Sequence, residues 1–81
     1  MDQQDKWTND EGILTKTFTF GNFVEAVDFV NKIVPLAERV GHHPDIEIYS
    51  YKNVKVKLST HDAGNIVTKK DIELSKEIDK L

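Results

Sequence analysis

Two stretches of the chain alternate between apolar and polar residues. Within residues 13–20 the apolar side consists of Leu14, Phe18 and Phe20, and the polar side consists of Thr15, Thr17 and Thr19. Residues 54–59 alternate in the same way, with Lys55 and Lys57 on the polar side. A period of two with β-branched and aromatic residues is typical of a half-buried strand, and alternating lysines are typical of a solvated sheet face. The sequence therefore predicts a strand in each stretch.

Between these stretches the apolar period changes to three or four residues, which gives one apolar helical face. From Phe23 onward the recurring positions are Ala26, Phe29, Val30, Ile33, Ala37 and Val40. Asn22 is suited to be the N-cap of this helix, with Glu25 completing an arrangement like a capping box, and Gly41 is suited to end it. Pro35 removes a backbone donor inside the pattern, which predicts a kink or a restart of the helix there.

Shorter signals complete the order of elements. Residues 6–8 resemble a short strand that is followed by a turn over residues 9–12. Ile46 and Ile48, with a turn near residues 52–53, predict a strand that forms an antiparallel hairpin with residues 54–59. After a loop at residues 62–67, Thr68 and Asp71 resemble a capping box that begins a final helix. Its apolar stripe consists of Ile72, Leu74, Ile78 and Leu81.

The predicted order of elements is β-β-α-β-β-α. A four-stranded, mostly antiparallel sheet with both helices packed on one face would bury the apolar stripes, so we predict an α+β fold. The length of 81 residues suits one domain, and we expect a single domain over residues 1–81.

Composition narrows the classes of function. The net charge is -3 and Arg39 is the single arginine, which argues against nucleic-acid binding, because phosphate contacts need an excess of Lys and Arg. The absence of cysteine excludes disulfides, thiolate metal sites and a cysteine nucleophile. No apolar run approaches the ~20 residues that span a bilayer, and residues 1–6 lack the apolar core of a secretory signal. We therefore expect a cytoplasmic protein with no membrane partner.

Three histidines, His42, His43 and His61, lie where predicted elements end. Histidine is the side chain whose unperturbed charge change falls near neutral pH. Nineteen positions separate His42 from His61, and a hairpin between them would bring both to the same end of the sheet. A histidine at a chain bend is often only a surface group, but three at one end could share a pocket.

Two chemistries remain open for such a pocket. Three neutral imidazoles with a water form a known type of catalytic zinc site, although adjacent histidines in extended backbone point to opposite sides. General acid–base catalysis asks only for one group that donates a proton and one that accepts it. The sequence contains neither a glycine-rich phosphate loop nor a recognisable serine nucleophile.

Acidic residues near the histidines could orient them. Glu38 lies one helical turn before His42, and Asp62 directly follows His61. Two of the acids also have simpler interpretations: Glu38 as an exposed helical carboxylate, and Asp71 as a first-turn acid that stabilises the last helix through its dipole.

One set of residues follows a characteristic spacing along the chain: Glu38, His42-His43-Pro44, Tyr51, His61 and Asp71. This pattern resembles the signature of the pterin-4a-carbinolamine dehydratases, a family also known as the dimerisation cofactors of a homeodomain transcription factor. The resemblance continues outside the signature, for example at Trp7, and covers nearly the whole chain.

The resemblance implies a hydro-lyase that converts 4a-hydroxytetrahydropterin to quinonoid dihydropterin and water, with no metal or other cofactor. It implies that His42, His43 and His61 surround the pterin as the catalytic residues. We assign proton transfer to His42 and His61, and binding and orientation of the pterin to His43.

The substrate-binding residues expected around these histidines are Glu38, Pro44, Asp62 and Asp71. The resemblance also implies a small-molecule pterin as the substrate and assembly into a homodimer or homotetramer. The alternative is a non-catalytic pterin-binding or dimerisation module of the same fold. Assembly alone does not require three imidazoles in one place, which favours the enzyme.

Overall fold

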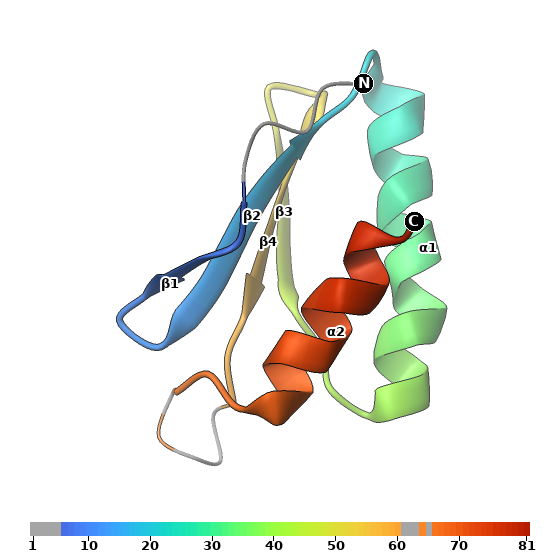
Figure 1. Cartoon of the computed structure of the whole chain (residues 1–81). Helices are drawn as coiled ribbons and strands as arrows, with labels where there is room; N and C mark the ends of the chain where they lie inside the picture. Colours follow the sequence, from blue (N-terminus) through green and yellow to red (C-terminus); the bar gives the residue numbers. More distant parts are fainter. Residues whose placement is uncertain (1–5, 61–63, 65) are drawn as a thin grey trace.

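The computed structural model describes residues 6–60, 64 and 66–81. Its elements are β1 (Thr8–Asp10), β2 (Ile13–Thr19), α1 (Phe23–Val40), β3 (Asp45–Tyr49), β4 (Asn53–Leu58) and α2 (Lys69–Asp79). The strands form one antiparallel sheet in the order β1-β2-β4-β3 (Figure 1). The predicted α+β fold and the predicted order of elements are both confirmed.

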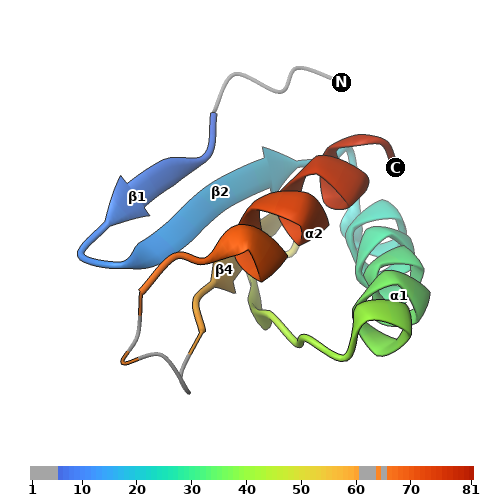
Figure 2. The ribbon, with the colours of Figure 1, turned by 60° about the horizontal axis from the view of Figure 1, so that its bottom comes forward.

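Both helices cover the same face of the sheet (Figure 1, Figure 2). The core between them consists of Leu14 and Phe18 from β2, Val54, Val56 and Leu58 from β4, Ala26, Phe29 and Ile33 from α1, and Leu74 and Ile78 from α2. The rings of Phe18 and Phe29 lie 4.7 Å apart between their centroids. The apolar sides predicted for β2 and β4 are therefore the sides that face the helices.

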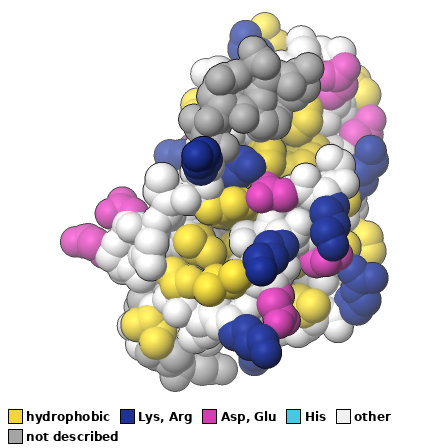
Figure 3. Space-filling view, viewed as in Figure 1, with side chains coloured by type: hydrophobic (Ala, Val, Ile, Leu, Met, Phe, Trp, Pro, Cys, Tyr) yellow, Lys and Arg dark blue, Asp and Glu magenta, His cyan; other side chains and the backbone are white. Residues whose placement is uncertain are grey.

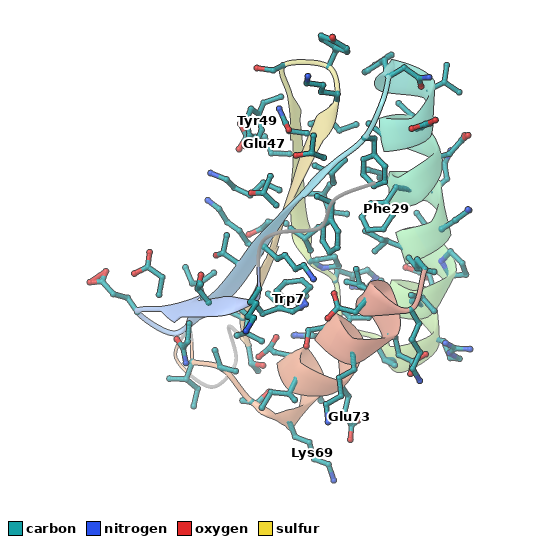
Figure 4. The ribbon with its side chains drawn as sticks, turned by 45° about the horizontal axis from the view of Figure 1, so that its top comes forward. Trp7, Phe29, Glu47, Tyr49, Lys69 and Glu73 are labelled. Carbon is teal, nitrogen blue, oxygen red and sulfur yellow. The ribbon has the colours of Figure 1, made fainter. Side chains whose placement is uncertain are left out.

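The opposite face of the sheet is polar. The strand register places Asp45 opposite Lys57 and Glu47 opposite Lys55, so opposite charges are neighbours across the two strands. Glu47 and Tyr49 point away from the helices, on the edge strand β3 (Figure 4). The alternating lysines thus belong to a sheet face that the helices do not cover, as predicted.

Both ends of α1 follow the sequence signals. The side chain of Asn22 accepts a hydrogen bond from the N–H of Glu25 at 2.8 Å, and the carboxylate of Glu25 accepts one from the N–H of Gly21 at 2.9 Å. Gly41 ends the helix in the left-handed conformation, with φ 66°. Because this region favours glycine, the residue type and the backbone agree.

α1 continues through Pro35, so the helix does not restart there. Pro35 cannot donate to the carbonyl of residue 31, four positions earlier. It lies on the exposed side of the helix, while Ile33 and Ala37 on either side of it are buried. We attribute the continuity of α1 to this packing, since tertiary contacts supply most of the stability of helices in proteins.

Two element boundaries differ from the prediction. The first strand is Thr8–Asp10 rather than residues 6–8, and Trp7 instead donates from Nε1 to the carboxylate of Asp79 in α2 at 3.0 Å. The turn between β3 and β4 falls at residues 50–52, where Ser50 and Tyr51 have φ angles of 49° and 54°. Serine and tyrosine rarely adopt this region, so neither residue signals a turn in the sequence.

The buried face of α2 also differs from the predicted stripe. It consists of Asp71, Leu74, Ser75 and Ile78, whereas Ile72 is 44% exposed and Leu81 is 46% exposed. The prediction followed the apolar residues, but the helix turns a carboxylate toward the interior at its first turn. That carboxylate belongs to the site described below.

The outer face of α2 carries charges of both signs. Lys69 lies 3.8 Å from Glu73, and Lys80 lies 3.2 Å from Glu77. Lysines and acidic residues are interspersed across this side of the molecule (Figure 3). Within the ranges that the structure describes, no helix combines the length and the apolar character needed to cross a membrane.

Replacement of Pro35 by alanine should stabilise the protein. Alanine restores the missing backbone donor at an exposed position, so we expect Pro35→Ala to raise the free energy of unfolding by roughly 1–3 kcal/mol. Denaturant unfolding followed by circular dichroism measures this, with Lys32→Ala on the same helix as the control for an exposed substitution. An unfolding free energy at or below that of the parent protein would show that α1 gains nothing from the restored bond.

Candidate active site

His42 lies where α1 ends and the chain turns toward β3. Gly41 reverses the backbone, and the N–H of His42 donates to the carbonyl oxygen of Ala37 at 3.1 Å. The imidazole reaches the beginning of α2, where its Nε2 is hydrogen-bonded to Oδ1 of Asp71. The side chain of His42 is 12% exposed and that of Asp71 is 0% exposed, so the pair is sheltered from water.

The second oxygen of Asp71 is also occupied. Oδ2 accepts hydrogen bonds from the N–H of Thr68 at 2.9 Å and from the hydroxyl of Thr60 at 2.8 Å. Thr68 is the N-cap of α2, so Asp71 supplies the acid of the predicted capping box. Donors from the segment after α1, from the segment after β4 and from the start of α2 therefore meet on one carboxylate.

These donors keep Asp71 ionised. Burial raises the pKa of Asp71, but the N–H of Thr68 lowers it, and the neighbouring imidazole and the hydroxyl of Thr60 lower it further. The net result is a pKa below the usual value for aspartate. Hydrogen bonds to the charged form thus outweigh desolvation, and the buried group is an anion at neutral pH.

An ionised carboxylate fixes the tautomer of His42. A carboxylate can only accept hydrogen bonds, so Nε2 carries the hydrogen that joins the two side chains. In the neutral imidazole, Nδ1 then holds the lone pair. The aspartate of a catalytic triad orients its histidine in the same way. His42 is therefore arranged to accept a proton at Nδ1.

His43 forms a separate and more exposed pair. Its Nε2 lies 2.6 Å from Oε2 of Glu38, and the two side chains are 63% and 67% exposed. Glu38 thus contacts His43 rather than His42, the imidazole one helical turn ahead of it. An ion pair this exposed stabilises the fold little, but the contact sets where the imidazole of His43 lies.

Two hollows lie beside His43. With Pro44, Glu38 and Ile46 it lines a cavity of about 180 Å³. Together with Lys57 and other residues it also lines a cavity of about 420 Å³. His43 and Pro44 thus face space that a small molecule can enter, while His42 points toward α2.

His61 and Asp62 lie outside the described residues. Thr60 directly precedes them in the sequence. Its N–H donates to the carbonyl oxygen of Ile66 at 3.0 Å, and its hydroxyl donates to Asp71. The segment that contains His61 therefore begins at a residue bonded to the same carboxylate as His42.

Two features of the site were not predicted from the sequence, the contact made by the hydroxyl of Thr60 and the burial of Asp71. A signal for the second exists: Asp71 precedes Leu74 and Ile78 by three and seven positions, which places it on the buried side of the helix. Thr60 has no such signal. Among the described residues, no group of three or more His, Cys, Asp or Glu side chains could hold a metal ion; the zinc alternative depends on His61, which is not among them.

The sequence model of one family, described as pterin 4 alpha carbinolamine dehydratase, matches residues 1–81. The chain belongs to this family. The resemblance drawn from Glu38, the histidines and Asp71 is thereby confirmed.

Two similar proteins carry the name pterin-4-alpha-carbinolamine dehydratase, and in both cases the name is a provisional assignment. A protein of this name from Sulfurisphaera tokodaii is 51% identical to this chain over 75 residues, which cover 93% of this chain and 78% of the relative. The one from Picosynechococcus is 48% identical over 81 residues, which cover 100% of this chain and 86% of the relative.

Solved structures share the fold of this dehydratase-family chain. A protein from Brucella melitensis, described as a transcriptional coactivator/pterin dehydratase, is 31% identical and has a TM-score of 0.84, with coverage of 94% of this chain and 81% of that chain. A second protein, described as pterin dehydratase-like and as a RuBisCO assembly factor of the alpha-carboxysome, has a TM-score of 0.77 over 98% of this chain and 92% of that chain. At 21% identity the second likeness shows the fold alone.

The buried carboxylate predicts a dependence of stability on pH. Because the pKa of Asp71 is lowered in the folded protein, its contribution is complete above the pKa of the unfolded chain and is lost as the pH falls through the folded pKa. We expect Asp71→Asn to lower the free energy of unfolding by roughly 1.5–3 kcal/mol near pH 7, the range for hydrogen bonds to charged groups. This deficit should shrink as the pH falls below about 4.

Denaturant titrations of both proteins between pH 7 and pH 3 measure this deficit. Asp28→Asn, an exposed change on α1, is the matched control and should show no comparable trend. A deficit for Asp71→Asn that stays constant over the whole range would contradict the assignment of a buried anion.

Proposed function

We propose that the chain is a hydro-lyase that dehydrates a 4a-hydroxytetrahydropterin to quinonoid dihydropterin and water. The observation that carries this proposal is the buried pair of His42 and Asp71, in which an anionic carboxylate fixes the tautomer of a nearly buried imidazole. Membership of the dehydratase family supports the choice of a pterin as the substrate.

The reaction requires two proton movements. The bond between C4a and the hydroxyl oxygen breaks, and an acid protonates that oxygen so that it leaves as water. The ring nitrogen N5 gives up its proton to a base, and a double bond forms between N5 and C4a. General acid and base catalysis by two positioned imidazoles meets both requirements near neutral pH.

The roles follow from which imidazole nitrogens are already engaged. Nε2 of His42 is committed to Asp71, so we propose that Nδ1 of His42 takes the proton from N5. His61 would then protonate the leaving hydroxyl. His43, oriented by Glu38 at 2.6 Å, would bind the pterin beside Pro44, and Asp62 would contact the substrate from the segment after β4.

The test is the rate of dehydration of a freshly generated 4a-hydroxytetrahydropterin, with a chelator present. We expect the parent protein to accelerate the reaction, and His42→Ala and His61→Ala each to reduce kcat by ~100-fold or more, which is within the usual range for acid–base groups. Lys69→Ala, an exposed change on α2, is the control and should keep full activity. Unchanged turnover in His61→Ala would remove the assignment.

A second candidate is a non-catalytic pterin-binding or dimerisation module. Its support is the shared fold with the RuBisCO assembly factor, a protein described by assembly rather than by dehydration. This candidate is favoured if the parent protein binds a reduced pterin or self-associates without accelerating dehydration, and if His42→Ala leaves both properties intact.

We also propose that the chain forms a homodimer or a homotetramer. β3 is an edge strand, with one side that no described strand pairs, and such edges favour pairing with another chain. Sedimentation of the purified protein distinguishes these states from a monomer.

A further inference from the structure

Thr60 connects two parts of the site that the proposed catalysis needs. Its hydroxyl oxygen lies 2.8 Å from Oδ2 of Asp71 and 2.6 Å from the hydroxyl oxygen of Thr68. A hydroxyl has one hydrogen, and the carboxylate can only accept, so Thr60 donates to Asp71 and accepts from Thr68. The resulting chain of hydrogen bonds runs from Thr68 through Thr60 to Asp71, and from the other carboxylate oxygen to His42.

The same residue closes the base of the segment that contains His61. Its backbone N–H donates to Ile66 at 3.0 Å, and residues 60 and 66 form an isolated antiparallel bridge. The backbone bridge and the contact with Thr68 therefore join both ends of this segment. Thr60 is thus bonded to the orienting partner of one proposed proton-transfer residue and is the sequence neighbour of the other.

We propose that Thr60 is a positioning residue that holds the carboxylate of Asp71 in the orientation that fixes the imidazole of His42. This inference rests on the proposed function, because it assigns Thr60 a part in the same reaction. Thr60 does not exchange a proton with the substrate. It shares Oδ2 of Asp71 with the N–H of Thr68, and its hydroxyl approaches that oxygen from the segment after β4, so the two donors together fix the direction of the carboxylate.

Three substitutions test this role. Thr60→Val keeps the shape of the side chain but removes the hydroxyl, and Thr60→Ser keeps the hydroxyl but removes the methyl group. Thr17→Val on β2 is the matched control, because it makes the same chemical change on the open face of the sheet. Thr60→Ala replaces Thr60→Val if the valine does not fold, as judged by circular dichroism.

Thr60→Val should reduce kcat by roughly tenfold to a hundredfold, the size of effect expected when a catalytic group is displaced by about 1 Å. The KM should stay within about threefold of the parent value, since Thr60 contributes to orientation rather than to pterin binding. Thr60→Ser and Thr17→Val should stay within about threefold of the parent kcat, because each keeps the hydroxyl that bonds to Asp71.

A measurement on Asp71 itself separates positioning from general loss of structure. The hydroxyl of Thr60 stabilises the carboxylate, so Thr60→Val should raise the pKa of Asp71, as followed by the carboxyl carbon signal in NMR. Thr60→Ser and Thr17→Val should leave that titration unchanged. In Thr60→Val the Nε2 proton signal of His42 should also shift or broaden.

The outcomes distinguish this inference from the proposed function. A parent-like kcat or an unchanged Asp71 titration in Thr60→Val overturns the positioning role. If the parent protein does not dehydrate the pterin, the proposed function fails, and the NMR titration alone decides whether Thr60 orients Asp71 and His42.

Discussion

The structure around the candidate site depends on one buried carboxylate. Asp71 has no exposed surface, yet it remains ionised because donors from three separate segments contact its two oxygens. A buried charge is tolerated only when hydrogen bonds and opposite charge compensate for its lost hydration. The end of α1, the segment after β4 and the start of α2 must therefore come together for this carboxylate to be stable, and its burial specifies their relative positions.

Asp71 both caps a helix and, in the proposed function, orients a catalytic imidazole. As the acid of the capping box, Asp71 stabilises the N-terminus of α2, where the helix dipole favours negative charge. As the partner of His42, it selects which ring nitrogen holds the lone pair. Because both interactions are present in the folded protein without a ligand, the imidazole is oriented before any substrate arrives, as the proposed acid–base catalysis needs. The pair of His43 and Glu38, exposed on the surface, lacks this support and is better suited to adapt to a ligand.

The sequence predicted the features that depend on neighbouring residues. The burial of Leu14 and Phe18, the cap at Asn22 and the end of α1 at Gly41 all follow from local period or residue type, and all are confirmed. The pairing of His42 with Asp71 could not be predicted in this way, because the two are separated by 29 positions and meet only after the helices pack.

The side-chain partner of Glu38 could not be predicted from the sequence either, although it lies only five positions away. Spacing along an uninterrupted helix points Glu38 toward His42, but the left-handed residue between them ends the helix and brings His43 to Glu38 instead. For Thr60, the sequence offers a hydroxyl beside a histidine and no indication of what it contacts. Tertiary structure alone supplied that information.

The backbone conformation of Gly41 restricts which sequences can form this site. A methyl group added at Gly41 would meet no atom within 4 Å, so the position is spacious, and yet its φ of 66° disfavours nearly every side chain. The requirement is therefore torsional rather than steric, and it falls on a residue that has no part in the proposed proton transfer. The φ angle of Gly41 sets the direction in which the chain leaves α1 toward His42. In a related protein without this glycine, a different backbone turn would be needed to bring the imidazole to Asp71 at the start of α2.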